Sequence, residues 1–213
     1  MPDAREEILS RIRAATRDSA GAEIAAEREA IPRNYIAAGQ LDPEARLSLF
    51  IERLRDYDAH VVETEAASLP EAILGVLREQ GERKVIVAEG FPLELLPGNF
   101  SFLPETQADV DDLNGCDGMV TGCTVAIAAT GTIVLTHGPG EGSRRLTLLP
   151  DRHLCVVRAD QVVETVPEAM QRLAPFAVHP LTFISGPSAT ADIEMTRIRG
   201  VHGPRFLDIV LVR

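Results

Sequence analysis

The segment from residue 42 to residue 88 constrains the fold most, because it reads as a helix, a strand, a second helix and a second strand. Asp42 and Pro43 are residue types that begin a helix, as N-cap and first helical position. The apolar positions that follow recur at helical spacing: Leu47, Phe50, Ile51 and Leu54. We expect strands at 60–62 and 84–88, with a helix at 69–80 between them. A strand–helix–strand unit of this length predicts parallel pairing and an α/β domain.

The second half of the chain adds further strands to this pattern. Two strands, at 125–128 and 132–135, are expected to join through Thr130-Gly131, where glycine supplies a positive φ. A helix over 125–129 remains open, because alanine is a good helix former. The other expected elements are strands at 154–157, 181–184 and 207–212 and a short helix at 167–173. The last strand carries Asp208 inside its apolar run, and its remaining residues favour an internal position.

The N-terminal region differs from the rest. A helix is expected to start near Asp3, and its apolar residues form one stripe: Ile8, Leu9, Ile12 and Ala15. This stripe is typical of a helix that packs on its own domain, which we favour, and also of a helix that docks on a partner. We therefore expect a helical N-terminal extension over residues 1–40 and an α/β domain over residues 41–213.

Charge and cysteine content exclude several classes of function. The formal net charge of -11 disfavours binding to nucleic acid and to anionic lipid, since both require a basic face. No apolar run approaches the ~20 residues that span a bilayer, and the first residues do not resemble a signal peptide. Three cysteines without a Cys-x-x-Cys pair (Cys116, Cys123 and Cys155) fit a reduced cytoplasmic protein and predict no metal or iron–sulfur cofactor. The acidic run 109–117 lacks the calcium-loop pattern and is interpreted as a solvated face.

Arg144 and Arg145 follow a glycine-rich loop at residues 136–143. The loop matches neither nucleotide-binding glycine pattern. A guanidinium group binds carboxylate or phosphate through two parallel hydrogen bonds, so one of these arginines is a candidate anion ligand. A surface pair bridged to acidic neighbours is the alternative. Adjacent residues on an extended strand point to opposite faces, so both line one pocket only if the backbone turns there.

The stretch 183–194 reads as a buried strand, a tight turn and the start of a helix expected at 192–199. The exposed N–H groups of a helix start can hold an anion. Candidate ligand residues here are Ser185, Gly186, Ser188 and Thr190. However, Asp192 and Glu194 would place negative charge in the first helical turn, which favours a hydrogen-bonding ligand edge or a purely structural turn.

Three blocks together resemble the lactate utilisation protein C family, whose members share the LUD domain. They are residues 126–135, with Thr130-Gly131-Thr132, residues 143–150, with Arg144-Arg145, and residues 185–194 followed by 200–205. The resemblance implies a three-layer α/β sandwich with a mostly parallel sheet, of the kind found in phosphosugar isomerases, CoA transferases and 5-formyltetrahydrofolate cyclo-ligase. It covers the chain from about residue 60 onwards.

The resemblance also implies a role in the oxidation of L-lactate to pyruvate, in the cytoplasm, beside partner subunits that carry iron–sulfur clusters. The expected role is to bind a small carboxylate or to assemble those subunits. Ala129 replaces the glutamate that members usually have before Thr-Gly-Thr, which removes one carboxylate from the expected site. No catalytic residue is carried over. The candidate ligand residues are Thr130, Gly131, Thr132, Arg144, Arg145, Ser185, Gly186, Ser188 and Thr190. The alternative is a free-standing small-molecule enzyme of the same fold, suggested by the fold and by Arg144-Arg145, although fold alone does not imply function.

Overall fold

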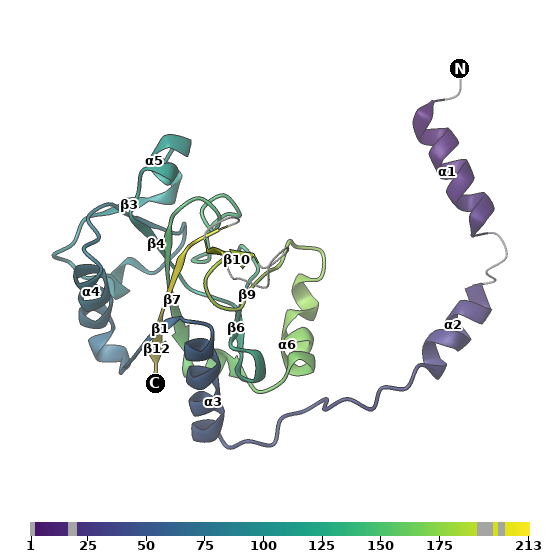
Figure 1. Ribbon diagram of the computed structural model, residues 1–213, viewed down its shortest axis with the longest axis horizontal. Coiled ribbons are helices and arrows are strands. Elements are labelled where there is room, and N and C mark those ends of the chain that lie inside the picture. The colour runs from purple at the N-terminus through teal and green to yellow at the C-terminus, as the bar shows by residue number, and fades with distance from the viewer. Residues whose placement is uncertain (1–2, 17–20, 191–197, 200–202) are drawn as a thin grey trace. The chain divides into compact units, whose positions relative to one another are not determined.

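The computed structural model of the chain describes residues 3–16, 21–190, 198–199 and 203–213 (Figure 1). The chain divides into two compact units, Met1–Tyr35 and Ile36–Arg213. The first unit contributes two helices, and the second contains the sheets.

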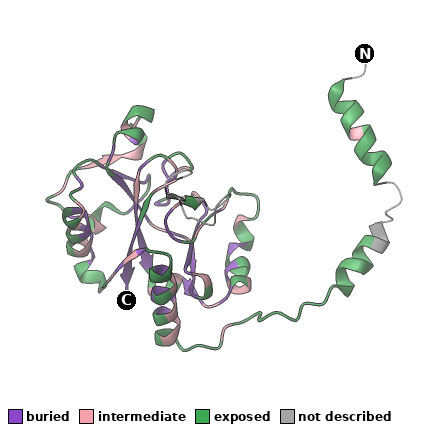
Figure 2. Ribbon diagram, in the orientation of Figure 1, coloured by how far each residue is buried: buried purple, intermediate pink, exposed green. Residues whose placement is uncertain are grey.

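The N-terminal unit contains helices α1 (Ala4–Ala15) and α2 (Gly21–Ala30). The side chain of Asp3 accepts a hydrogen bond from the backbone N–H of Arg5 and begins α1, as the sequence predicted. No residue of α1 is buried, and Ile8 and Ile12 are 57% and 52% exposed (Figure 2). The apolar stripe of α1 therefore forms no core within this unit.

The main sheet of the second unit is entirely parallel. Its order is β1 (His60–Thr64), β12 (Phe206–Val212), β7 (Arg152–Arg158), β4 (Gly118–Thr121), β2 (Val85–Val87) and β3 (Phe102–Pro104). The apolar strand β12 lies inside this sheet, between β1 and β7, as expected from its residues. Parallel strands buried on both faces need such continuous apolar runs.

The direct pairing expected between residues 60–62 and 84–88 is wrong. β1 and β2 are parallel members of one sheet, but β12, β7 and β4 lie between them. A crossover helix determines the direction of the next strand but not which strand it pairs with. Three strands from later in the chain therefore lie between β1 and β2. The strand–helix–strand pattern identified the sheet type correctly and the neighbours incorrectly.

Helices cover both faces of the main sheet. α4 (Leu69–Glu79) packs on one face, where Ile73 and Leu77 contact alternate residues of the central strands. α3 (Pro43–Asp56) packs on the other face; its N-cap is Asp42, and the four predicted apolar residues are its buried ones. Figure 1 shows α4 on one side of the sheet and α3, β6, β9 and α6 on the other. The prediction of a mostly parallel α/β sandwich is confirmed.

A second, four-stranded sheet, which the sequence did not predict, joins α3 in the layer opposite α4. Its order is β8 (Val162–Val163), β5 (Val125–Ile127), β6 (Thr132–Leu135) and β9 (Thr182–Ile184). β5 and β6 form the expected antiparallel hairpin, with Gly131 at a φ of 59°. This result settles the choice between strand and helix at residues 125–127. Helix α6 (Val166–Leu173) packs against β5 and β8.

Two further elements differ from expectation. The acidic run holds a short helix, α5 (Val110–Asn114), which Asp109 begins with a capping box. After residue 186 the chain forms β10 (Ala189–Thr190), paired antiparallel with β11 (Ile198–Arg199). The helix expected at 192–199 is therefore wrong at its end, and residues 192–197 of that prediction lie outside the described residues.

Candidate functional site

A cavity of about 260 Å³ lies beside the second sheet, near the amino ends of β7 and β12. Most of its wall comes from three separate segments of the chain, namely the turn at 144–148, the stretch 182–189 and the pair Gly203-Pro204, and His153 and Leu207 of the main sheet complete it. These segments belong to the sequence blocks in which Arg144 and Ser185 were singled out. The fold therefore brings together residues that are about 40 positions apart.

Arg144 lies at this cavity because the backbone turns immediately after the glycine-rich loop. The N–H of Leu146 donates to Ser143 Oγ at 3.3 Å, and the N–H of Thr147 donates to the carbonyl of Ser143 at 3.1 Å. Leu146 is fully buried and anchors the turn. Both arginines are exposed, but the turn places only Arg144 in the cavity wall, and Arg145 does not line the cavity.

The guanidinium of Arg144 has no carboxylate within ion-pair distance among the described residues. Its hydrogen bond goes to Thr182 Oγ1, at a long 3.4 Å. A hydrogen bond of this length is weak. An exposed arginine of this kind can exchange that contact for a ligand anion at little free-energy cost.

Thr182 also contacts His137, and this contact defines the polar wall of the cavity. His137 Nε2 lies 2.7 Å from Thr182 Oγ1, and His137 Nδ1 lies 2.7 Å from the carbonyl oxygen of Gly142. The two residues meet because β6 and β9 are antiparallel neighbours, with Leu135 opposite Thr182. His137 has a φ of 57°, which is uncommon outside glycine and turns the chain at the end of β6.

A buried carboxylate holds the glycine-rich loop in shape. Glu141 is 5% exposed and accepts hydrogen bonds from the N–H of Thr136 at 2.5 Å, from Thr136 Oγ1 at 2.9 Å and from Thr124 Oγ1 at 2.5 Å. A second carboxylate, Glu105, accepts from the N–H of Ser143 at 2.9 Å. These hydrogen bonds hold the glycine-rich loop in place. The loop supplies the carbonyl of Gly142, which contacts His137, and leads into the turn that carries Arg144.

Hydroxyl groups continue from the cavity towards the β5–β6 hairpin. Ser185 Oγ, which lines the cavity, lies 2.6 Å from Thr132 Oγ1, and Thr132 Oγ1 lies 2.7 Å from Thr130 Oγ1. Thr130, Thr132 and Ser185 also line a second, more open cavity next to α3. The hydroxyls of two predicted blocks therefore form one connected chain.

His153 forms part of the cavity wall from the main sheet. It is 1% exposed, its Nε2 lies 2.7 Å from Thr121 Oγ1, and burial lowers its pKa to about 3. The ring is therefore neutral at physiological pH. It adds polarity to the cavity without adding charge.

The structure distributes the nine predicted site residues over several positions. Arg144, Ser185, Gly186 and Ser188 line the cavity at β9, whereas Thr130 and Thr132 line the neighbouring one. Gly131 forms the hairpin turn, and Thr190 lies in β10. The helix start expected at residue 192 lies outside the described residues; before it, Gly186 turns the chain at a φ of 82°, and β10 follows.

Sequence reasoning missed His137, Thr182, Glu141 and His153. Each depends on a partner distant in sequence or on a backbone conformation that the sequence does not reveal. The available signal is the glycine-rich loop itself, because Glu141 lies within it and His137 at its start.

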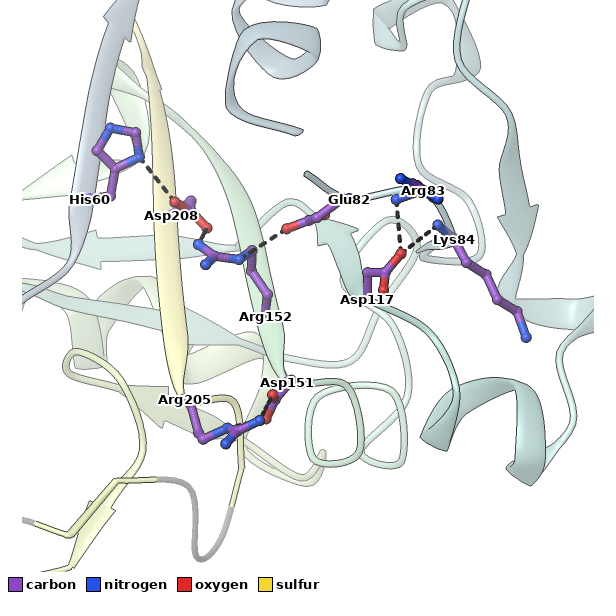
Figure 3. Close-up of polar contacts among 9 residues, drawn as sticks. All are labelled: His60, Glu82, Arg83, Lys84, Asp117, Asp151, Arg152, Arg205 and Asp208. Atoms are coloured by element: carbon purple, nitrogen blue, oxygen red, sulfur yellow. Dashed lines mark hydrogen bonds and ion pairs between the residues drawn. The ribbon is translucent and has the colours of Figure 1, made fainter. Parts of the chain in front are cut away.

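A separate polar cluster lies at the amino edge of the main sheet (Figure 3). Arg152 contacts Glu82 through Nε at 3.1 Å and Asp208 through Nη1 at 2.8 Å, and Asp208 contacts His60 Nδ1 at 3.0 Å. Asp117 accepts from the N–H groups of the chain entering β2, and Asp151 pairs with Arg205. Both arginines of this cluster are paired with its carboxylates, Arg152 with Glu82 and Asp208 and Arg205 with Asp151, so we assign it a structural role.

No metal site or membrane span was found in the part of the chain that the structure describes. No group of three or more His, Cys, Asp or Glu side chains there could hold a metal ion. Within the same residues, no helix is long and apolar enough to cross a membrane.

Comparison with known proteins places the chain in a family. Residues 47–212 match the LUD domain. The chain belongs to the LUD domain family. A relative named lactate utilization protein C, from Deinococcus radiodurans, is 42% identical over 187 residues, which is 86% of this chain and 87% of that protein. A protein of the same name from Halalkalibacterium halodurans is 31% identical over 74% of this chain and 75% of its own length.

A solved structure shows the same fold. The crystal structure of a DUF162 family protein from Deinococcus radiodurans aligns with a TM-score of 0.72 at 38% identity, covering 82% of this chain and all of that one. The LUD domain of this chain therefore has the architecture expected from its three sequence blocks.

Proposed function

We propose that this LUD domain protein is the component without iron–sulfur clusters of a cytoplasmic L-lactate oxidation system, and that its cavity at Arg144 binds a small carboxylate. The names of its relatives support a role in lactate utilisation. The absence of a Cys-x-x-Cys pair agrees with partner subunits that carry the clusters. The partner subunits are part of this proposal because of the family resemblance.

One observation carries the carboxylate proposal. Arg144 is a guanidinium without a carboxylate partner among the described residues, and it lies in the wall of a cavity lined by the hydroxyl-bearing residues Thr182, Ser185 and Ser188. In a chain of net charge -11, a guanidinium that lines a polar cavity and has no acidic partner among the described residues is a candidate anion ligand. The cavity volume of about 260 Å³ is several times the ~30 Å³ that one water molecule occupies in the liquid, so a three-carbon acid fits.

The test is calorimetric titration of L-lactate, pyruvate and propionate into the full chain and two variants. Arg144→Gln should weaken binding of every carboxylate by about tenfold or more, the usual effect of losing a charge-assisted hydrogen bond. Arg145→Gln is the matched control, because it removes the same charge from the next residue, which does not line the cavity. Equal affinities in the two variants would refute the assignment.

A growth assay tests the cellular role. Deletion of the gene should abolish growth on L-lactate as sole carbon source, and the Arg145→Gln variant should restore it where Arg144→Gln does not. Restoration by both variants would favour a scaffold without a ligand role. The alternative, an enzyme for nucleotide, CoA or folate substrates, predicts stabilisation by those compounds and not by lactate in a thermal shift screen.

A further inference from the structure

The hydrogen-bond directions around Thr182 have a consequence for the kind of acid that the cavity accepts. A carbonyl oxygen can only accept, so the 2.7 Å contact with the carbonyl of Gly142 requires a hydrogen on His137 Nδ1. In a neutral imidazole, Nε2 then carries the lone pair. The 2.7 Å contact between Nε2 and Thr182 Oγ1 must therefore use the hydroxyl hydrogen of Thr182.

This assignment leaves Thr182 as an acceptor towards the cavity. A threonine hydroxyl has one hydrogen and two lone pairs. The hydrogen is committed to His137, and one lone pair faces the N–H of Arg144 at 3.4 Å. The remaining lone pair can receive a hydrogen bond from a ligand but cannot give one. Thr182 is 9% exposed. A ligand group without a hydrogen to donate would therefore lose its hydrogen bonds to water beside Thr182 and gain none in return.

Thr147, which also lines the cavity, donates its hydroxyl hydrogen to the carbonyl oxygen of Arg144 at 3.1 Å and is restricted in the same way. The serine Ser185 carries no such restriction. Ser185 Oγ and Thr132 Oγ1 contact each other at 2.6 Å, and either can be the donor. A serine hydroxyl rotates to suit its ligand. Thr182 therefore differs from Ser185 in having a fixed direction, which the carbonyl of Gly142 sets through His137.

We propose that His137 and Thr182 select 2-hydroxy acids over 2-oxo acids at this site, with Arg144 binding the carboxylate and Thr182 accepting the hydrogen of the 2-hydroxyl group. The proposal rests on the carboxylate site proposed above. A 2-oxo group has only lone pairs and would face the lone pair of Thr182. An unsubstituted acid would leave that lone pair without a partner. His137 acts here as a positioning residue, since it contacts Thr182 and not the ligand.

The decisive measurement is the ratio of dissociation constants for L-lactate, pyruvate and propionate. The wild-type chain should bind L-lactate about tenfold more tightly than either of the others, the usual effect of one buried hydrogen bond and its mismatch. Thr182→Val keeps the shape of the side chain and removes the hydroxyl. The preference for L-lactate over pyruvate and propionate should therefore disappear, while pyruvate still binds. Thr182→Ser should retain the preference. Arg145→Gln should leave all three constants unchanged.

Nitrogen-15 NMR of the wild-type chain provides a readout that does not depend on a variant. His137 should show a protonated Nδ1 and an unprotonated Nε2 at neutral pH. The opposite tautomer, or equal binding of L-lactate and pyruvate with Arg144 still required, would overturn the selectivity and leave the carboxylate site standing. Failure of all three acids to bind would instead overturn the proposed function, and the selectivity with it.

Discussion

Replacing Glu82 by glutamine should flatten the pH dependence of stability between about pH 4.5 and pH 7. Glu82 is 8% exposed, and one of its oxygens lies 3.1 Å from Arg152 Nε. Gly118 makes room for the carboxyl group, because a β-carbon there would lie 2.8 Å from Glu82 Oε2. Burial raises the pKa of Glu82 from 4.5 to about 7; Arg152 opposes this rise, and the charges of Asp208 and Asp117 add to it.

The sign follows from which state holds the proton more tightly. Between about pH 4.5 and pH 7 the folded chain keeps Glu82 protonated, whereas the unfolded chain releases the proton. Stability should therefore fall as the pH rises through this range and become independent of Glu82 above it. The difference between the two pKa values corresponds to about 3 kcal/mol at full effect. Since the measurement starts at pH 5, above the unfolded pKa of 4.5, and the folded chain relaxes around the ionised carboxylate, we expect about 2 kcal/mol to be measured.

The assay is urea unfolding followed by circular dichroism at pH 5, 6, 7 and 8, for the wild-type chain, Glu82→Gln and the control Glu79→Gln. Glu79 is exposed at the end of α4 and loses the same charge. The quantity to compare is the change in unfolding free energy from pH 5 to pH 8, since other groups also titrate in this range. Glu82→Gln should lose about 2 kcal/mol less than the wild type over this range, and the control should follow the wild type. Parallel profiles for all three proteins would refute the reasoning.

Two further predictions concern residues whose environment the structure defines closely. His153, whose pKa burial lowers to about 3, makes the folded state less stable as the pH falls from 6.5 towards 3, because only the unfolded chain takes up the proton. His153→Gln should remove a few kcal/mol of this acid sensitivity, measured by urea unfolding at pH 4 and pH 7; an unchanged difference would contradict the buried neutral ring. Gly131→Ala should destabilise the chain by about 2 kcal/mol, because φ is positive and the new β-carbon would lie 2.8 Å from the backbone carbon of Arg53. Gly75→Ala, in the middle of α4 with open space around it, should instead stabilise by about 0.5–1 kcal/mol, and similar effects at both glycines would show that neither constraint operates.

The elements that the sequence predicted well are those governed by local interactions. Asp42 and the spacing of Leu47, Phe50, Ile51 and Leu54 predicted the start and buried face of α3. Gly131 marked the turn between β5 and β6. In each case residues within one or two turns of each other determine the outcome, so a single stretch of sequence holds the necessary information.

The elements that failed depend on which strands pair with one another. The apolar runs at β1, β12, β7, β4 and β2 are similar in composition, and nothing in them states which lies next to which. Ile198-Arg199 fitted the end of a helix by local pattern, yet these residues pair with Ala189-Thr190 as a strand. Strand pairing overrode the local preference for a helix there.

The candidate site shows the same division. By itself the sequence determined the parallel α/β class, the hairpin at Gly131 and the candidate status of Arg144 and Ser185, because periodicity, turn chemistry and residue type are local properties. The tertiary structure alone decided that Arg144 lines the cavity while Arg145 does not, and that His137 meets Thr182 across β6 and β9. The direction of a hydrogen bond depends on which acceptor a folded loop brings to each ring nitrogen, and only the packed chain supplies the carbonyl of Gly142 at that place.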